Sequence, residues 1–257
     1  MTVTVPESSP LPPALVERVH RLLAGPPRAA SAAGQPDRAG QPDGAGKSDR
    51  AGKSDRAGQA HLTGQAHGGP RRLLGITGPP GAGKSTVSAR LRQAFGARCV
   101  VVPMDGFHLA QTTLERLGRA NRKGAPDTFD AAGFVALLRR LRHPVPGEVV
   151  WAPEYRREAH NAIAGALAVP SDVPLVVVEG NYLLVREHGF APVAGLLDET
   201  WYVAPDDGVR LERLVARHER FGKAPEAARA WSLGPDEANA RLIASTASRA
   251  DLVVDPG

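Results

Sequence analysis

The feature that most constrains the fold of this chain is a glycine-rich turn between an apolar run and a helical pattern. Residues 73–86 read LLGITGPPGAGKST and contain the full G-x-x-x-x-G-K-[ST] phosphate-binding pattern. Glycines let such a turn direct backbone N–H groups around a polyphosphate, and the dipole of the following helix favours the same anion. We therefore expect a strand, a phosphate-binding loop and a helix in succession. The residues expected to hold the phosphates are Gly78, Pro79, Pro80, Gly81, Ala82, Gly83, Lys84, Ser85 and Thr86.

Two side chains of this loop carry chemistry of their own. Lys84 is expected to reach the β- and γ-phosphates of a nucleotide, and the Ser85 hydroxyl is expected to ligate Mg²⁺. A second GAGKS stretch begins at Gly44, but Gln41 stands where the first loop glycine belongs and no apolar strand precedes it. The structural context therefore favours the loop at 78–86.

Composition divides the 257 residues into three parts. Residues 1–25 predict a short amphipathic helix, because apolar side chains recur at helical spacing after Pro12 and Pro13, and Gly25 ends the pattern. Residues 26–69 are rich in glycine, alanine, proline and charge, with too few apolar side chains to form a core, so we expect a disordered low-complexity insert. Residues 70–257 have the size and pattern of one α/β domain.

The third part alternates between strand and helix patterns. Its apolar runs predict strands before the glycine-rich loop and at 99–103, 174–178, 201–203 and 251–254. Helical patterns lie between these runs, at 84–95, 130–142, 207–221 and 235–247. Nearly continuous aliphatic strands separated by amphipathic helices are typical of a parallel sheet covered on both faces. The predicted fold is a P-loop NTPase-type α/β fold with about five parallel strands.

Two acidic residues stand at predicted strand ends. Asp105 follows the second strand, and Glu179 ends the third. In parallel sheets, ligands bind beyond the carboxyl ends of the strands. Phosphoryl transfer to a hydroxyl uses a carboxylate to orient or deprotonate the acceptor and an anionic group around Mg²⁺. The two carboxylates match this need, and the alternatives are a turn role for Asp105 and a capping role for Glu179.

Several stretches together resemble a known family. The phosphate loop, the DGFH sequence from Asp105 and the EGNYLL sequence from Glu179 are similar to the uridine kinase, pantothenate kinase and phosphoribulokinase group of P-loop kinases. Residues 104–110 and 123–130 (KGAPDTFD) look like its branch of nucleoside, nucleotide or sugar kinase-like proteins, and the similarity covers about residues 71–254. The resemblance implies ATP and Mg²⁺ as cofactors, Asp105 as the catalytic base and Glu179 as a magnesium-side carboxylate.

The segment 151–161 (WAPEYRREAHN) resembles the part of these kinases that borders the acceptor pocket. Arg156 departs from the pattern, because an aspartate is expected there, and a cation at this position favours an anionic group on the acceptor. A polar surface loop is the alternative interpretation. The substrate contacts that the resemblance implies are Asp105, His108, Tyr155, Arg157, His160 and Asn181.

A row of arginines marks the helix predicted at 207–221. Arg210, Arg213, Arg217 and Arg220 fall on one face of it. By resemblance to related kinases, Arg213 and Arg217 are the expected lid arginines, which would act with Lys84 and Asp105 in catalysis by stabilising charge on the transferred phosphoryl group. A solvated helix face is the alternative.

Charge and composition narrow the class of partner. The net charge is +5, and residues 71–257 carry only +3 of it. No basic run with interleaved aromatics is present, so we expect a small-molecule acceptor and no nucleic acid. A signal-peptide pattern and an apolar stretch of spanning length are both missing, which predicts a cytoplasmic protein without membrane contact. A homodimer is compatible with the sequence.

These patterns together predict ATP-dependent, Mg²⁺-requiring phosphoryl transfer to a hydroxyl of a small metabolite, namely a nucleoside, a pantothenate-like compound or a sugar. The alternative is a nucleotide-dependent ATPase or switch protein that has no small-molecule acceptor, which a phosphate loop alone permits. Asp105 and the segment 151–161 favour the kinase, because a switch has no need of them.

Overall fold

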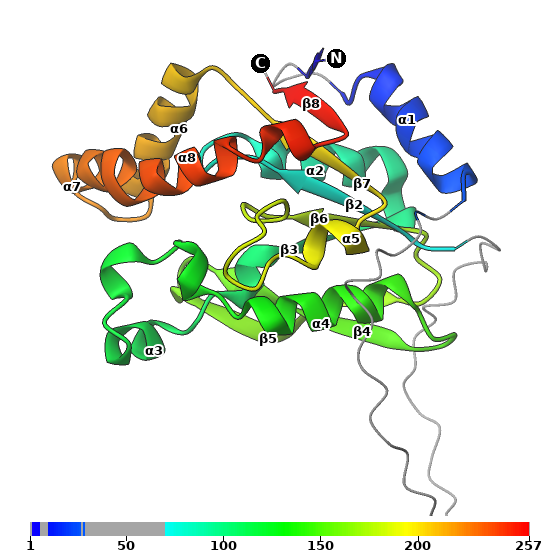
Figure 1. Ribbon diagram of the computed structural model, residues 1–257, viewed down its shortest axis with the longest axis horizontal. Coiled ribbons are helices and arrows are strands. Elements are labelled where there is room, and N and C mark those ends of the chain that lie inside the picture. Colours follow the sequence, from blue (N-terminus) through cyan, green and yellow to red (C-terminus); the bar gives the residue numbers. More distant parts are fainter. Residues whose placement is uncertain (1, 6–9, 27, 29–69, 257) are drawn as a thin grey trace, which may run out of the picture.

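A parallel sheet forms the centre of the computed structural model, which describes residues 2–5, 10–26, 28 and 70–256 (Figure 1). Six described strands pair in the order β1-β8-β7-β2-β6-β3, all of them parallel. The predicted parallel α/β fold is confirmed, with one strand more than the five expected. The strands are β1 (Thr2–Thr4), β2 (Arg72–Thr77), β3 (Cys99–Pro103), β6 (Leu175–Glu179), β7 (Glu199–Val203) and β8 (Leu252–Asp255).

The helices that follow the strands lie near their predicted positions. Beyond α6, the chain forms two helices joined by a π-helical turn at Ser232–Asp236, where a single helix over 235–247 was expected. Among the described residues, no helix combines the length and the apolar character needed to cross a membrane. The helices are α1 (Pro13–Ala24), α2 (Lys84–Phe95), α3 (Gln111–Arg116), α4 (Ala131–Arg142), α5 (Val193–Leu196), α6 (Asp207–Arg220), α7 (Pro225–Trp231) and α8 (Glu237–Ala244).

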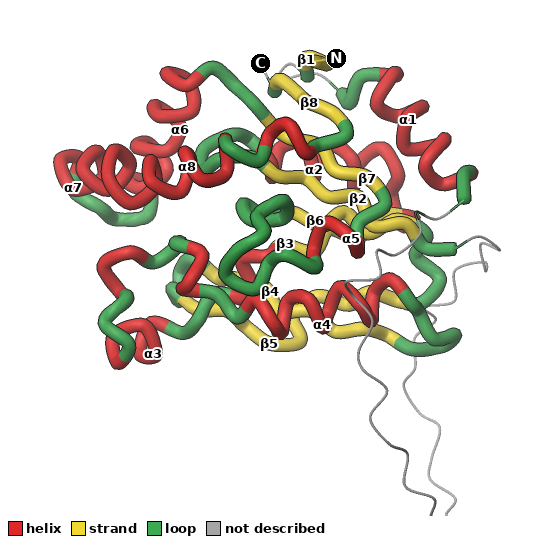
Figure 2. The backbone as a smooth tube through the Cα atoms, in the orientation of Figure 1, coloured by secondary structure: helices red, strands yellow, loops and turns green. Residues whose placement is uncertain are grey.

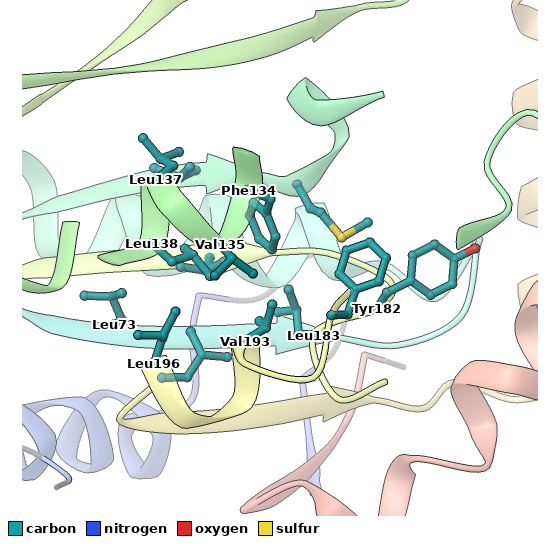
Figure 3. Close-up of a cluster of buried hydrophobic side chains, with 14 of the residues drawn as sticks. Leu73, Phe134, Val135, Leu137, Leu138, Tyr182, Leu183, Val193 and Leu196 are labelled. Carbon is teal, nitrogen blue, oxygen red and sulfur yellow. The ribbon is translucent and has the colours of Figure 1, made fainter. Parts of the chain in front are cut away.

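Helices cover both faces of the sheet because its strands are apolar on both sides. In β6, the four aliphatic residues 175–178 are fully buried. One face packs against α1 and α2, through side chains such as Leu15 and Leu91. The other face packs against α4, α5 and α8, and Figure 3 shows Phe134 and Leu138 of α4 in the same cluster as Val193 and Leu196 of α5. A strand buried on both sides reads as a continuous aliphatic run, which made β6 predictable.

A two-stranded antiparallel hairpin, β4 (Val149–Arg156) and β5 (Asn161–Pro170), forms a second sheet, which packs against the first through Val150, Ala152 and Val169. Its pairing places Tyr155 opposite Ala162, and the register shifts between Ala152 and Glu154. Figure 1 shows the hairpin on the same side of the sheet as α4. The segment 151–161 is thus the end of a hairpin, so a surface loop is the wrong description of it.

The N-terminal segment is an integral part of the sheet. The predicted amphipathic helix is present as α1, and β1 pairs with β8, so that the two ends of the chain lie side by side (Figure 2). Arg72 of β2 donates to the carbonyl oxygens of Leu22 and Gly25 and so ties the end of α1 to the sheet. The predicted insert at 26–69 lies outside the described residues, apart from Pro26 and Arg28.

A buried charge cluster around Asp198 joins elements that are distant in sequence. Its carboxylate accepts hydrogen bonds from the backbone N–H of Leu73 at 2.9 Å and from Arg142 at 3.0 Å, and lies 3.7 Å from the Arg72 guanidinium. The side chain of Asp198 is only 1% exposed, and that of Arg72 is fully buried. Removing one partner from such a cluster leaves charges without compensation, which costs more than the pairing itself contributes.

We expect Asp198→Ala to lower the free energy of unfolding by about 3–5 kcal/mol, because Arg72 and Arg142 would remain buried without their anion. Urea denaturation measures this change. The matched control is Glu17→Gln, which breaks an exposed pair at 4.0 Å to Arg21 and should change stability by less than about 0.5 kcal/mol. Equal effects of the two substitutions would contradict this account of Asp198.

Candidate active site

The glycine-rich loop turns directly from β2 into α2. Gly78, Gly81 and Gly83 have φ values of 148°, 82° and 86°, which lie in the region that favours glycine. A Cβ atom on Gly78 would lie 2.5 Å from the Val203 carbonyl oxygen, and one on Gly81 would lie 2.6 Å from that of Arg210. The loop conformation therefore requires glycine both for its dihedral angles and for close packing against β7 and α6.

Lys84 is buried within this loop. Its Nζ donates to the carbonyl oxygens of Gly78 and Pro79, each at 2.9 Å. Burial lowers the pKa of Lys84 to about 8, opposed by the carboxylates of Glu179 and Asp105. An ammonium that is this poorly solvated gains much from a nearby polyphosphate, because the phosphate would replace neutral acceptors with charged ones.

The two predicted carboxylates lie at the same edge of the sheet as the loop. In the parallel register, Glu179 pairs with Ile76 of β2 and with Pro103 of β3. Asp105 follows β3 in a 3-10 turn (Met104–Phe107), and its charge acts on both Lys84 and Glu179. The structure therefore brings Asp105 and Glu179, which the sequence places at strand ends, together with Lys84 at the start of α2.

Ser85 and Glu179 together present oxygen ligands. The Ser85 hydroxyl donates to Oε1 of Glu179 at 2.7 Å. Burial raises the pKa of Glu179, while Lys84 and the Ser85 hydrogen bond favour its ionised form. A hydroxyl and a carboxylate next to a phosphate site fit the preference of Mg²⁺ for oxygen donors, of which phosphates and water supply the rest.

Asp105 and Glu179 are each followed by a glycine, which allows a neighbouring segment to pack closely against the backbone at that point. A Cβ atom on Gly106 would lie 2.3 Å from the Pro153 carbonyl oxygen, and one on Gly180 would lie 2.7 Å from Cβ of Met104. Gly106 therefore lets β4 of the hairpin lie against the turn that carries Asp105. The DG and EG pairs of the sequence are packing requirements of the site.

His108 and Tyr155 form an aromatic wall beside Asp105. The His108 ring centroid lies 3.9 Å from that of Phe129 and 4.9 Å from that of Tyr155, and its Nδ1 lies 2.9 Å from the Asp105 carbonyl oxygen. Burial lowers the pKa of His108 and raises that of Tyr155, so both rings favour their neutral forms. The pair is suited to contact an uncharged part of an acceptor.

Arg156 does not face this wall. Its guanidinium pairs with Glu154 at 2.8 Å, and its side chain is 56% exposed. Successive side chains of a strand point to opposite faces, so Tyr155 and Arg156 diverge. The structure therefore places Arg156 beside Glu154 and away from the aromatic wall, and the local reason is the alternation of β4; an effect of this cation on the acceptor stays a prediction.

Arg157 and Arg217 approach the site from two elements. Arg157, just past β4, lies over the ring of Phe221 at 5.4 Å, where the chain leaves α6. Burial lowers the pKa of Arg217, and Arg157 lowers it further, while Asp236, Asp105 and Glu179 oppose the shift. Arg217 thus shares the electrostatic environment of both carboxylates, as a lid arginine would.

The remaining arginines of α6 differ among themselves. Arg210 is 3% exposed and donates to Asp207 and Glu237, at 2.6 and 2.7 Å, and to the Pro80 carbonyl oxygen of the loop at 3.4 Å. It anchors α6 to the phosphate loop, a role that the sequence analysis missed because the arginine row gives no sign of burial. Arg213 is half-buried on the same helix.

Two predicted acceptor residues contribute mainly backbone contacts in this structure. The carbonyl oxygen of Asn181 accepts the Thr77 hydroxyl at 3.1 Å. His160 is exposed at the hairpin turn with a φ of 49°, and its carbonyl oxygen accepts from Lys123 at 2.7 Å. The structure thus places Asn181 next to the end of β2 and His160 at the turn of the hairpin, in contact with Lys123.

The geometry agrees with the comparisons with known proteins. Residues 73–257 match the phosphoribulokinase / uridine kinase family. The chain belongs to this family. It is 32% identical over 190 residues to the uncharacterized protein YggC of Escherichia coli K12, covering 72% of this chain and 78% of that protein. It is 33% identical over 152 residues to a uridine kinase of Clostridium botulinum strain Okra, covering 56% of this chain and 68% of that enzyme.

A solved structure supports the same assignment. It is that of a candidate fructose transport system kinase from Silicibacter sp. TM1040, which is 39% identical and superimposes with a TM-score of 0.65, covering 72% of this chain and 89% of that one. The protein is therefore a small-molecule kinase, which uses ATP to phosphorylate a small metabolite.

In this kinase, we expect Gly106→Ala to push β4 away from the turn of Asp105. The clash with the Pro153 carbonyl should cost about 1–3 kcal/mol of stability and, by displacing Asp105, reduce turnover about 10- to 100-fold. Gly234→Ala is the matched control, since a Cβ atom there meets no atom within 4 Å. Thermal unfolding measures the stability, and an assay of ATP turnover measures the activity. An unchanged turnover in Gly106→Ala would contradict the role of Gly106 in positioning Asp105.

Proposed function

We propose that this kinase transfers the γ-phosphoryl group of Mg²⁺-bound ATP to a hydroxyl of a nucleoside, a pantothenate-like compound or a sugar. The convergence of Lys84, Asp105 and Glu179 at one sheet edge is the observation that carries the proposal. The candidate fructose transport system kinase named above makes sugars the first acceptors to test.

In the proposed mechanism, the loop 78–86 holds the phosphates of ATP through its backbone N–H groups, and Lys84 binds the β- and γ-phosphates. Ser85 and Glu179 would hold Mg²⁺, which supplies charge neutralisation when bound. Their contact at 2.7 Å supports this role, because it already places two oxygen ligands together beside the loop.

Asp105 is the proposed base. Its carboxylate would accept the proton of the acceptor hydroxyl as the acceptor oxygen bonds to the γ-phosphorus, and the bond from that phosphorus to the bridging oxygen of ADP breaks. Arg217, with Arg213 from the same helix, would stabilise the charge on the transferred group. The charges of Asp105 and Glu179 both raise the pKa of Arg217, which supports a place for this guanidinium near the transferred phosphoryl group.

The acceptor would lie against the aromatic wall. His108 and Tyr155 are the proposed contacts for its uncharged part, and Arg157, His160 and Asn181 complete the proposed boundary. The modest charge of residues 71–257 supports a small acceptor in place of a nucleic acid.

Asp105→Asn tests the proposed reaction against a nucleotide switch. Loss of the base should reduce acceptor-dependent ATP consumption about 10²- to 10⁴-fold while ATP affinity stays within a few-fold. The assay screens nucleosides, pantothenate and sugars, with Lys84→Met as the blank. A switch protein would show no acceptor dependence and would be nearly indifferent to Asp105→Asn, and that result would refute the kinase mechanism.

The low pKa of Lys84 predicts a proton linkage on ATP binding. The nucleotide's phosphates should raise this pKa from about 8 toward the ordinary value of a lysine, so ATP binding at pH 8.5 should take up between about half and three quarters of a proton. Without nucleotide, Lys84 holds its proton to higher pH in the unfolded chain than in the folded one, so the contribution of Lys84 to stability should rise with pH between about 8 and 10.5. Burial raises the pKa of the Cys99 thiol, which contributes in the opposite direction, so the effect of Lys84 is the difference between wild type and Lys84→Met. Calorimetry in buffers of different ionisation enthalpy measures the uptake, which Lys84→Met should abolish.

A further inference from the structure

Lys123 lies on the acceptor side of the site. Its Nζ donates to the Gln111 side-chain oxygen at 3.2 Å and to the His160 carbonyl oxygen at 2.7 Å. The same ammonium lies 5.4 Å from the centroid of the Tyr155 ring. The side chain thus spans from α3 to the end of the hairpin and contacts the aromatic wall between them.

The ammonium of Lys123 differs from the cations that precede it. Arg119 and Arg122 both pair with the carboxylate of Asp127, at 3.4 and 2.8 Å. The two hydrogen bonds of Lys123 go to neutral oxygens, and burial lowers its pKa, with Glu115 opposing the shift more weakly. A half-buried ammonium with neutral acceptors gains most from an anion.

The surroundings of Lys123 hold it in place. The Asn161 side-chain oxygen accepts the backbone N–H of Gln111 at 3.1 Å, which fastens α3 to β5. The charges of Lys123 and Arg157 both act on His108, whose ring nitrogen contacts the Asp105 backbone. Lys123 is therefore close enough to the proposed base for one small molecule to contact both.

We propose that the acceptor carries an anionic group, a carboxylate or a phosphate, which the Lys123 ammonium binds while the reacting hydroxyl faces Asp105. Gln111 and Asn161 position this ammonium, and Tyr155 packs against the carbon skeleton between the two ends of the acceptor. This inference rests on the proposed kinase function and adds to it a substrate class and a specificity-determining residue.

A purely structural role is the competing explanation. Lys123 would then serve only to fasten the hairpin end to α3, and its loss would weaken all acceptors alike. A charge role predicts a loss confined to anionic acceptors and restored by Lys123→Arg, because arginine keeps the charge. The two explanations therefore differ in a measurable selectivity.

The test compares acceptors that differ by one anionic group: glycerate with glycerol, pantothenate with panthenol, and fructose 6-phosphate with fructose. Calorimetric binding is measured with a non-hydrolysable ATP analogue and Mg²⁺, on the full chain and on Lys123→Met and Lys123→Arg. The control is Arg116→Met, which removes an exposed cation from α3 that donates to Thr113 at 3.3 Å.

We expect wild type to bind at least one anionic acceptor about 10- to 100-fold more tightly than its neutral match. Lys123→Met should lose this difference, while Lys123→Arg and Arg116→Met should retain most of it. The pair that shows the preference tells a carboxylate from a phosphate. If no anionic acceptor is preferred by wild type, or if Lys123→Met weakens both members of the pair equally, the inference is overturned.

Turnover separates this inference from the proposed function. If no acceptor raises ATP consumption above the Lys84→Met blank, the proposed function fails, whatever the binding preference. A different result would leave the proposed function standing and overturn the inference. In that case a neutral acceptor is phosphorylated with the same kcat/KM by wild type and Lys123→Met, and anionic acceptors bind no more tightly to wild type than to Lys123→Met.

Discussion

The parallel register of three neighbouring strands is the constraint on which the site depends. Glu179 is paired on one side with Ile76 and on the other with Pro103, so β2, β6 and β3 end at one level. Glu179 stands at this level, and the phosphate loop and the turn that carries Asp105 both begin just beyond it. A slip of one residue would turn every side chain of a strand to the opposite face. In β6, a slip toward the core would carry the Glu179 carboxylate into the buried aliphatic stretch, which opposes it, so the end of this stretch helps to keep Glu179 beside Ser85.

The charged groups at the carboxyl ends of these strands, Lys84, Glu179 and Arg217, are all poorly solvated. Burial lowers the pKa of Lys84 and Arg217 and raises that of Glu179, so each group is held in a setting that disfavours its charged form. In that setting a polyphosphate would add the anionic charge that the cations lack, and a divalent cation would offset the carboxylates. The same burial that costs stability therefore favours binding of both ligands together.

Local patterns made much of this structure predictable, and long-range pairing made the rest unpredictable. The strand at 99–103 and the helix at 84–95 agree with the sequence to the residue, because an aliphatic run and a glycine before a helix are local signals. β1 was missed because three residues gain strand structure only by pairing with β8 at the other end of the chain. The hairpin was missed because Pro153 and a run of small side chains obscure its alternation. The site's carboxylates were found from strand ends, whereas the positions of Arg156 and Arg210 depended on side-chain direction and burial.

The two halves of the site are built from different parts of the fold. The nucleotide side, with Lys84, Ser85 and Glu179, comes from the strands and loop of the central sheet, where a change disturbs the core. The proposed acceptor side comes from α3, the end of the hairpin and the turns beside them. The hairpin packs into the core cluster through Val150, Ala152 and Val169, and its Pro153 lies against Gly106 in the turn that follows β3. Substitutions on these elements alter the acceptor surface while the sheet keeps its register. A fold arranged in this way can keep its ATP chemistry and change its acceptor, so the acceptor of this chain has to be inferred from residues such as Lys123 and not from the shape of the sheet.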